Sequence, residues 1–167
     1  KILITGFTGF LGSNLIDVFS KKYELIGITH KKKSKQKIIQ IQKNIRNLTI
    51  NDIPNDIDSI IHLAAISDIK FCNENPKECY QTNVDGTLNM LELSRKLDAK
   101  FLFMSTSHVY GNPTQLPISE DHRTEVTSVY STSKLVCEKI CESYSKLYGL
   151  NIPVVRLFST YGPFEPH

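Results

Sequence analysis

The sequence predicts an α/β protein built on a doubly wound parallel sheet, with helices on both faces of the sheet. Three observations carry this prediction: a strand-length apolar run opens the chain, a glycine-rich turn follows it at once, and further strand-like runs then alternate with helical periodicity or crossovers. Parallel strands need crossover connections, and such connections are usually helices. We therefore expect one domain over residues 1–167, with its ligand site beyond the carboxyl ends of the strands.

Six segments have the length and composition of strands. The first and the fourth are continuous apolar runs of the kind found in buried parallel strands, while the third alternates apolar and polar residues. The six expected strands are KILIT (1–5), ELIGIT (24–29), KIIQIQ (37–42), DSIIHLAA (58–65), KFLFMST (100–106) and NIPVVRLF (151–158).

Three segments show the apolar spacing of helices. The first covers residues 10–19, directly after the glycine turn. The second covers residues 76–97, and the third covers residues 128–148. The third ends at Gly149, where a left-handed glycine commonly closes a helix. The stretch before it, residues 111–128, is rich in turn formers and is expected to be a loop.

The composition excludes several classes of protein. With 40% hydrophobic and 22% charged residues, the chain has the makeup of a globular domain in water. No apolar run approaches the roughly 20 residues of a membrane span, and the glycines of the opening turn interrupt what would be the core of a signal peptide. We therefore expect a cytoplasmic protein without a membrane partner.

The cysteines and the lysines also bear on function. The four cysteines have no C-x-x-C spacing and no histidine partners, so reduced thiols and no metal site are expected. The net charge is +3, and five of the lysines lie in the run HKKKSKQK (30–37). No aromatic residues interleave with these lysines, so a solvated loop is preferred to a nucleic-acid site.

The glycine turn TGFTGFLG lies between the first strand and the first helix. Glycines permit a tight turn and a close backbone approach, and the N-terminus of the following helix favours a pyrophosphate. The position of the turn at a strand-to-helix junction makes it a strong signal for a dinucleotide. The expected contacts come from Gly6, Phe7, Thr8, Gly9, Phe10, Leu11 and Gly12.

The residues after the second strand bear on which dinucleotide binds. NAD-binding sheets usually carry an Asp or Glu there, which holds the ribose 2′-hydroxyl. Here no acidic residue occurs between Glu24 and Asp52, and the strand runs into His30, Lys31 and Lys33. A 2′-phosphate suits such a surface, so NADP is slightly favoured over NAD, and both stay open.

The stretch VYSTSK places Tyr130 and Lys134 one helical turn apart on the same face. A free phenol, with a pKa of about 10, is a poor base at neutral pH. A nearby ammonium group would favour the phenolate, and so would an oxidised nicotinamide. The phenolate could then take a proton from a sugar hydroxyl while hydride leaves its carbon. The fifth strand ends near Ser105, Thr106 and Ser107, which could share the hydrogen bond to the reacting oxygen.

Six motifs stand in the order found in the extended short-chain dehydrogenase/reductase family: TGFTGFLG, HLAA, NVDGTLNMLE, STSHVYG, YSTSK and VVRLFSTYGP. The sequence resembles this family over its whole length, in particular the branch of nucleotide-sugar epimerases and dehydratases. The resemblance implies a Rossmann-type fold, bound NAD(P), a nucleotide-sugar substrate and a smaller substrate domain after residue 167. It also implies a homodimer formed through a four-helix bundle, to which apolar positions would contribute, such as Met90, Leu135, Ile140 and Leu147.

The resemblance also implies roles for individual residues. Thr106, Tyr130 and Lys134 match the catalytic set, and Asn83 matches an asparagine that braces the active-site strands. Besides the glycine turn, the residues expected at the dinucleotide are His30, Lys31, Lys33, Asn44, Ile45, Leu63, Ala64, Ala65, Asn83, Ser105, Tyr130, Lys134 and Phe158. Those expected at the sugar are Ser67, Thr106, Ser107, His108 and Ser159.

Three positions depart from the pattern of the family. Dehydratases of the family carry an Asp-Glu pair directly after the catalytic threonine, whereas this chain has Ser107 and His108, so 4,6-dehydration is not expected. Asn44 stands where an Asp usually holds adenine, although an amide still offers a donor and an acceptor. Ser159 stands where an Asn usually contacts the substrate.

The function predicted from these observations is that of an NAD(P)-dependent nucleotide-sugar 4-epimerase, which uses transient hydride transfer. An NADPH-dependent reductase of a keto-sugar nucleotide stays open, because the lysine run favours NADP. A dinucleotide-sensing protein without catalysis is the third interpretation, and the intact catalytic set argues against it. Two other polar residues are assigned to the sheet itself: His62 as a hydrogen-bonded core residue and Arg156 as an anchor.

Overall fold

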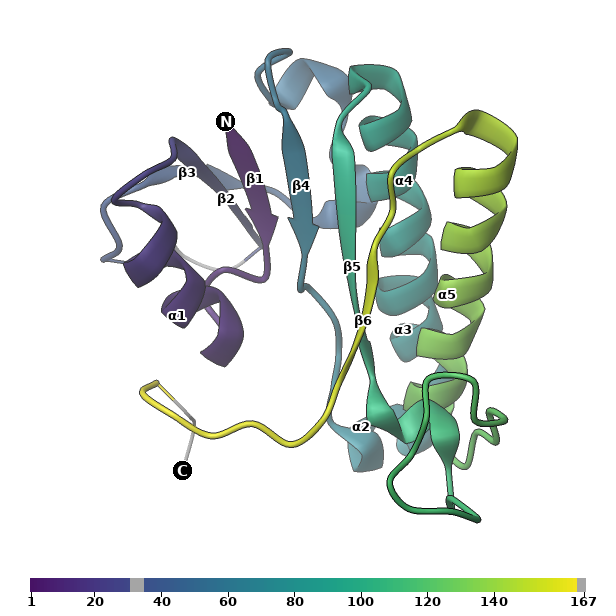
Figure 1. Cartoon of the computed structure of the whole chain (residues 1–167). Coiled ribbons are helices and arrows are strands. Elements are labelled where there is room, and N and C mark those ends of the chain that lie inside the picture. The colour runs from purple at the N-terminus through teal and green to yellow at the C-terminus, as the bar shows by residue number, and fades with distance from the viewer. Residues whose placement is uncertain (31–34, 165–167) are drawn as a thin grey trace.

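The computed structural model describes residues 1–30 and 35–164, and within them it shows a six-stranded parallel sheet. The strand order is β3-β2-β1-β4-β5-β6, and every pairing is parallel (Figure 1). The doubly wound α/β fold is therefore confirmed. The strands are β1 (Ile2–Thr5), β2 (Leu25–Thr29), β3 (Ile39–Gln42), β4 (Ser59–His62), β5 (Lys100–Thr106) and β6 (Val154–Leu157).

The strand order reverses at β1. The chain first builds outward through β2 to β3, and then it returns to the other side of β1, where β4 pairs with it. The segments that leave β1 and β4 diverge at the carboxyl edge of the sheet, and ligands of doubly wound folds bind at this switch point. The register pairs Thr5 with His62, so the glycine turn begins beside the segment that follows His62.

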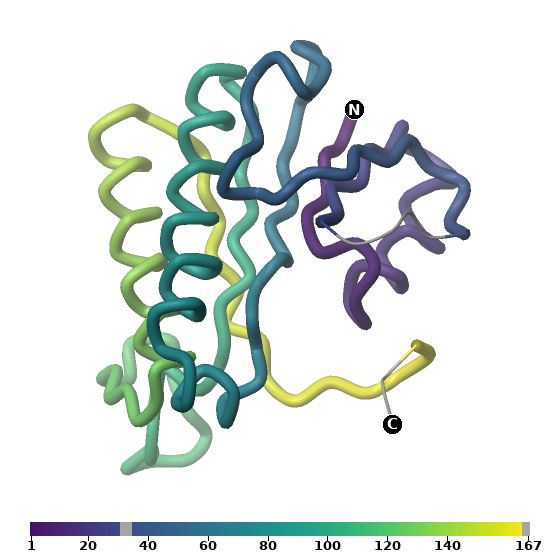
Figure 2. Tube along the Cα trace, turned by 180° about the vertical axis from the view of Figure 1, so that it is seen from behind, coloured from purple at the N-terminus to yellow at the C-terminus, as the bar shows by residue number. Residues whose placement is uncertain are grey.

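Helices cover both faces of the sheet. α1 (Phe10–Phe19) packs on one face, whereas α4 (Gly86–Leu97) and α5 (Val129–Tyr148) pack on the other, as the front and rear views show (Figures 1 and 2). The helix predicted over residues 76–97 is continuous but not uniform. It consists of α3 (Pro76–Tyr80), a π-helical turn at Gln81–Asp85, and α4.

Short helices lie in the connections. The sequence does not predict α2 (Ile69–Glu74), which is too short to show a helical period. Three 3₁₀ turns cover Ile45–Asn47, Ile50–Asp52 and Ser107–Tyr110. Among the helices of the described residues, none is both long enough and apolar enough to cross a membrane.

The core has one part on each face of the sheet. Leu3, Ile60 and Phe101 pack toward α4 and α5, while Ile4 and Ile16 belong to the part under α1. Met90 is fully buried in the first part, so the prediction that it contributes to a dimer surface is wrong. Its position on α4 turns the side chain toward the sheet. The four cysteines are free, and all are buried.

A buried ion pair joins α5 to the edge strand β6. The guanidinium of Arg156 donates three hydrogen bonds of 2.8–3.2 Å to the carboxylate of Glu138, whose side chain is only 8% exposed. Glu138 also accepts a hydrogen bond from the hydroxyl of Ser105 at 2.5 Å, and Arg156 donates to the carbonyl of Glu120 at 3.2 Å. Arg156 therefore anchors the sheet, as the sequence predicts, and it also holds the long loop before α5.

Replacing Arg156 with methionine should lower the free energy of unfolding by about 3–5 kcal/mol, because the Glu138 carboxylate would stay buried without its partner. The double variant Arg156→Met/Glu138→Met should recover most of this loss. Urea unfolding followed by circular dichroism measures both. Lys139→Met, which removes an exposed pair with Glu142 (3.0 Å), is the control and should change stability by less than about 0.5 kcal/mol. An Arg156→Met loss as small as that of the control would contradict the anchoring role.

Candidate functional site

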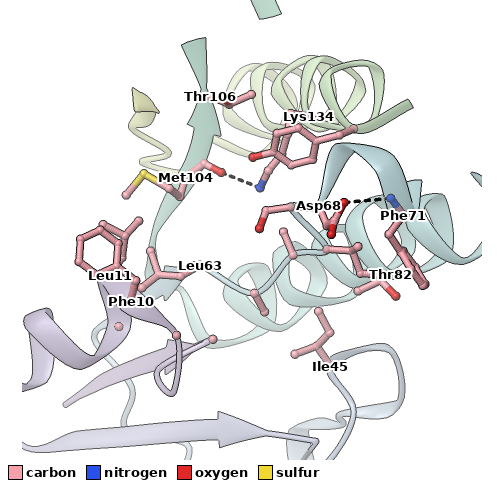
Figure 3. A pocket seen from close by; sticks show the side chains of 18 of the residues that line it. Phe10, Leu11, Ile45, Leu63, Asp68, Phe71, Thr82, Met104, Thr106 and Lys134 are labelled. Carbon is pink, nitrogen blue, oxygen red and sulfur yellow. Dashed lines mark hydrogen bonds between the residues drawn. The ribbon is translucent and has the colours of Figure 1, made fainter. Parts of the chain in front are cut away.

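A cavity of about 1390 Å³ opens at the carboxyl ends of the strands. It exceeds the roughly 300–1,000 Å³ of common small-molecule pockets. Its walls come from the glycine turn with the start of α1, from the segment after β4, and from the end of β5 with the first turns of α5 (Figure 3). The segment after β6 runs back toward α1 (Figure 1), where the side chain of Asn14 donates to the carbonyl of Pro163 at 2.7 Å.

The glycine turn needs its first and third glycines for packing. Gly6 has a φ of +70°, and a Cβ there would lie 2.7 Å from the backbone nitrogen of Ala64. A Cβ on Gly12 would lie 2.4 Å from the Cα of Phe7. At Gly9, by contrast, a Cβ would meet only the carbonyl oxygen of Gly6, at 3.3 Å. Packing within the chain therefore does not explain why position 9 is a glycine. A ligand that approaches the backbone closely would explain it.

The start of α1 suits an anion. Gly9 is the N-cap residue, so no side chain caps the helix, and the first turn contains no acidic residue. The first backbone N–H groups of a helix have no partner within the helix, and they form the positive end of its dipole. A phosphate group next to Gly9 would satisfy these N–H groups.

Residues 63–66, which follow β4, form the floor of the cavity, and we call them the floor segment. The backbone nitrogen of Ala64 donates to Thr5 Oγ1 at 3.1 Å. The side chain of Asn83 accepts from the nitrogen of Ile66 at 2.8 Å and donates to its carbonyl at 3.0 Å. Asn83 also donates to Ser133 Oγ on α5 at 2.9 Å. The floor segment is thus held at both ends by buried side chains.

The three predicted catalytic residues line one wall. Thr106 ends β5, whereas Tyr130 and Lys134 lie on the first turns of α5. The ammonium group of Lys134 is buried, donates to the carbonyl of Met104 at 2.8 Å, and lies 4.8 Å from the centre of the Phe103 ring (Figure 3). The helix begins with a capping box at Ser128 and Ser131, which fixes where its first turn starts.

Burial controls the charges on this wall. It lowers the pKa of Lys134 to about 8, so the side chain is still mostly protonated at neutral pH. Burial raises the pKa of Tyr130, and the hydroxyl of Thr106 beside it acts in the opposite direction. The sequence predicts that Lys134 would lower the pKa of Tyr130. In this structure Lys134 alone does not lower it, because desolvation of the phenol outweighs the other effects.

The side of the cavity next to the ends of β2 and β3 carries side chains with nitrogen groups. His30 lines it directly after β2, and Lys43 lines it directly after β3. Lys43 is paired with Asp52 at 2.6 Å. Lys31 and Lys33, which the sequence assigns to this side, lie outside the described residues.

Most residues predicted for the site line this cavity, and among the described ones two do not. The side chain of Phe7 is buried in the core against Gly27, and Asn83 acts through the floor segment. The predicted residues that line it are Gly6, Thr8, Gly9, Phe10, Leu11, Gly12, His30, Asn44, Ile45, Leu63, Ala64, Ala65, Ser67, Ser105, Thr106, Ser107, His108, Tyr130, Lys134, Phe158 and Ser159.

Sequence reasoning missed other lining residues, of which Arg46, Asp68 and Met104 are the most informative. Asp68 caps α2 by accepting from the nitrogen of Phe71 at 2.9 Å (Figure 3), and an Asp at the start of a short helix is a signal that could have been found. Met104 contacts Lys134 through its carbonyl, so its side chain gives no signal. Arg46 lies in a 3₁₀ turn too short to show a period.

The family model described as "NAD dependent epimerase/dehydratase family" matches residues 2–167. The chain belongs to this family. The match includes the glycine turn, the floor segment and the wall with Tyr130 and Lys134. The family membership therefore confirms the resemblance that the six sequence motifs indicate.

Relatives of the chain include enzymes that are named for UDP-sugars. UDP-glucuronic acid decarboxylase 6 of Arabidopsis thaliana is 36% identical over 98% of this chain and 51% of that protein. A putative UDP-glucose 4-epimerase of Methanocaldococcus jannaschii is 34% identical over 96% of this chain and 56% of that protein. The chain therefore spans about half the length of the curated relatives it matches.

A solved structure shows the same fold. UDP-glucuronic acid 4-epimerase from Bacillus cereus, in complex with UDP-glucuronic acid and NAD, is 30% identical to this chain with a TM-score of 0.89. The likeness covers 99% of this chain and 58% of that one.

Alanine substitutions should separate the packing role of Gly12 from that of Gly9. Gly12→Ala should lower the free energy of unfolding by at least about 2 kcal/mol, because the added methyl group overlaps backbone atoms. Gly9→Ala should cost about 1 kcal/mol or less, mainly because alanine is a poorer N-cap. Urea unfolding followed by circular dichroism measures both values, and equal losses would contradict the packing described for the turn.

Proposed function

We propose that this chain forms the dinucleotide-binding and catalytic part of an NAD(P)-dependent nucleotide-sugar 4-epimerase. One observation carries the proposal: a single cavity joins the glycine turn and the start of α1 to a wall that presents Thr106, Tyr130 and Lys134. A dinucleotide whose phosphates lie at the glycine turn would extend toward that wall. Relatives named for UDP-sugar 4-epimerisation support the substrate class.

The cavity residues fit a nicotinamide dinucleotide. Gly9 leaves room for a pyrophosphate at the N-terminus of α1, which no side chain caps. Asn44 Oδ1 accepts from the backbone nitrogen of Arg46 at 3.0 Å, so we assign the adenine contact to the NH₂ group of Asn44. When bound, the dinucleotide would accept a hydride from a sugar carbon and return it.

We assign the proton transfer to Tyr130. Because burial raises its pKa, the phenol keeps its proton at neutral pH and needs added positive charge nearby before it can act as a base. Lys134 is mostly protonated and is held by the carbonyl of Met104, and an oxidised nicotinamide bound in the cavity would add the further positive charge. Thr106 would share the hydrogen bond to the reacting sugar oxygen.

The sugar would lie against Ser67, Ser107, His108 and Ser159, which line the same cavity. His108 is exposed, and its ring stands edge-on to Tyr130 with 6.3 Å between the ring centres. Hydroxyl and imidazole groups can bind neutral and anionic sugars alike, so the sugar itself is left open.

A smaller substrate domain that holds the nucleotide stays a prediction. Titration of residues 1–167 with UDP-, GDP- and dTDP-sugars tests it, and we expect no saturable binding.

Tyr130→Phe should lower epimerase turnover in the full-length protein at least about a hundredfold, because general acid–base groups usually contribute roughly 10²–10⁴. Its affinity for the dinucleotide should stay nearly unchanged. Interconversion of UDP-hexoses followed by chromatography measures the turnover. Tyr144→Phe is the matched control, since this hydroxyl lies on the same helix but donates to Glu92 at 2.7 Å. Wild-type turnover in Tyr130→Phe would contradict the catalytic assignment.

Two other reactions would use the same wall. A keto-sugar reductase stays a second candidate, because residues 25–51 contain no carboxylate and this favours NADP. Such a reductase would consume NADPH, whereas an epimerase consumes none.

Decarboxylation is suggested by a relative, and a uronic acid oxidised at C4 is a β-keto acid that can lose CO₂. With UDP-glucuronic acid, released CO₂ would indicate decarboxylation, and a C4 epimer would indicate epimerisation. A non-catalytic sensor would give neither product.

We also propose that NADP binds more tightly than NAD, since His30 lines the cavity after β2 and residues 25–51 contain no carboxylate that would repel a 2′-phosphate. Isothermal titration with both cofactors at physiological salt measures the preference. Lys31→Ala/Lys33→Ala should weaken NADP selectively, and Gly9→Ala should weaken both. NAD binding about tenfold tighter than NADP, a difference of about 1.4 kcal/mol, would overturn this preference.

We further propose a homodimer formed by the outer faces of α4 and α5. Leu88 on α4 and Val136 on α5 are each 40% exposed, and Leu147 near the end of α5 is 72% exposed. Exposed apolar side chains on two helices that pack together favour association. Light scattering at micromolar concentration should give twice the chain mass, and Val136→Glu should shift it toward the monomer. A monomeric mass for the wild type would contradict the dimer.

The cytoplasm stays our proposed location. All four cysteines are free and buried, which suits a reducing compartment. Fractionation of cells that express the full-length protein, with the protein in the soluble cytoplasmic fraction, tests this.

A further inference from the structure

His62 is a fully buried side chain that the proposed reaction does not use. Both ring nitrogens have a hydrogen-bond partner: Nδ1 lies 2.8 Å from Thr5 Oγ1, and Nε2 lies 3.1 Å from Thr87 Oγ1. The ring packs against Phe101 and Phe103, with ring centres 5.7 and 6.2 Å away. One nitrogen therefore faces β1, and the other faces α4.

The neighbouring bonds decide which nitrogen carries the proton. The hydroxyl of Thr87 donates to the carbonyl of Asn83 at 2.5 Å, and a hydroxyl has only one hydrogen. Nε2 of His62 must therefore donate to Thr87 Oγ1. In a neutral ring Nδ1 is then the acceptor, so it takes the hydrogen of the Thr5 hydroxyl. In the opposite tautomer one of two contacts would lack a hydrogen: the contact between Nε2 and Thr87 Oγ1, or the contact between Thr87 Oγ1 and the Asn83 carbonyl.

The ring is neutral at physiological pH. Burial is the largest cause, and the nearby charge of Lys134 adds to it, so that the pKa of His62 falls to about 3. The ring therefore carries one N–H, which the hydrogen bonds around it place on Nε2.

The hydrogen bonds that connect to the His62 ring reach the floor segment on both sides. On one side Thr5 Oγ1 accepts from the backbone nitrogen of Ala64 at 3.1 Å. On the other side Asn83, whose carbonyl accepts from Thr87, holds both backbone atoms of Ile66 at 2.8 and 3.0 Å. Ala64 in turn lies against the glycine turn, where a Cβ on Gly6 would come within 2.7 Å of its nitrogen.

We propose that His62, held as the neutral Nε2–H tautomer, is a positioning residue that fixes the floor segment against the glycine turn. The directed chain runs from Ala64 N–H through Thr5 to His62, and from His62 through Thr87 to Asn83. Its effect on ligand affinity rests on the proposed dinucleotide function, whereas the tautomer and the order of the floor segment do not.

The first test reads the tautomer directly. Long-range ¹H–¹⁵N correlation spectra of the ¹⁵N-labelled protein at neutral pH distinguish protonated from unprotonated ring nitrogens. We expect Nε2 of His62 to be protonated and Nδ1 to be unprotonated. A proton on Nδ1, or a mixture of tautomers in fast exchange, would overturn the proposal.

The second test uses a matched set of variants. Thr5→Val removes the hydroxyl but keeps the shape, Thr5→Ser keeps the hydroxyl, and Ser94→Ala removes a buried hydroxyl bond of 2.7 Å to Ala99 O at the opposite edge of the sheet. In Thr5→Val the amide hydrogen of Ala64 should exchange at least about tenfold faster, and NAD(P) should bind at least about tenfold more weakly, because the partly buried N–H of Ala64 and the buried Nδ1 of His62 lose their partner. Thr5→Ser and Ser94→Ala should leave both values near those of the wild type.

The outcomes separate the two proposals. If the wild type binds neither NAD nor NADP, the proposed function fails, while the tautomer and the exchange rate of Ala64 still test the role of His62. If the wild type binds and Thr5→Val exchanges and binds like the wild type, the positioning role is wrong. If Ser94→Ala weakens NAD(P) as much as Thr5→Val does, the effect follows from general stability, and the positioning role is again wrong. Should Thr5→Val fail to fold, the tautomer in the wild type decides.

Discussion

The side-chain amide of Asn83 is the contact on which the rest of the site depends. It closes two hydrogen bonds with the backbone of Ile66 and a third with Ser133, so one side chain sets the floor of the cavity against the helix that carries Tyr130 and Lys134. Asn83 lies in the middle of the π-helical turn Gln81–Asp85. Such turns are uncommon and often occur at functional sites.

The π turn is supported by side chains around it. The carbonyl of Asn83 accepts from Thr87 Oγ1 at 2.5 Å and from the thiol of Cys137 at 3.2 Å. A buried carbonyl without donors would be costly, so these two side chains stabilise the expanded turn. Cys137 thus has a structural use as a small, weak donor, which agrees with the expectation of a reduced thiol.

The cavity wall with Tyr130 and Lys134 combines two groups whose charged forms burial disfavours. Desolvation raises the pKa of Tyr130 and lowers that of Lys134, so both changes oppose an ionised tyrosine–lysine pair. The sequence predicts the pair from its helical spacing, but spacing carries no information about desolvation. The phenol of Tyr130 would therefore stay protonated until a further positive charge enters the cavity. This would link proton transfer to the presence of an oxidised cofactor.

The strand and helix pattern was predictable because parallel strands are apolar runs and the helices are periodic. The ends of the elements were less predictable, and β4 shows why. The apolar run DSIIHLAA continues past His62, but β4 ends at His62. Residues 63–65 leave the sheet there and line the cavity. Their apolar character suits a ligand as well as it suits a core, so the sequence cannot separate the two.

Two site details depend on contacts between distant residues. Phe7 was expected at the dinucleotide because it lies within the glycine turn, yet it fills the space beside Gly27 on β2, which has no side chain. The sequence predicts Lys134 at the dinucleotide, and in this structure it lines the cavity and donates to a backbone carbonyl of β5. Neither a neighbour that lacks a side chain nor a carbonyl partner leaves a local signal in the sequence.

The central claim is that the glycine turn, the floor segment and the first turns of α5 form one ready-made dinucleotide site. Hydrogen–deuterium exchange measured with and without NAD(P) tests this claim most directly. We expect added protection at residues 6–12 and 63–66 and at the start of α5, with the rest of the sheet nearly unchanged. Protection confined to other surfaces, or no protection at ligand concentrations that saturate related enzymes, would contradict the account.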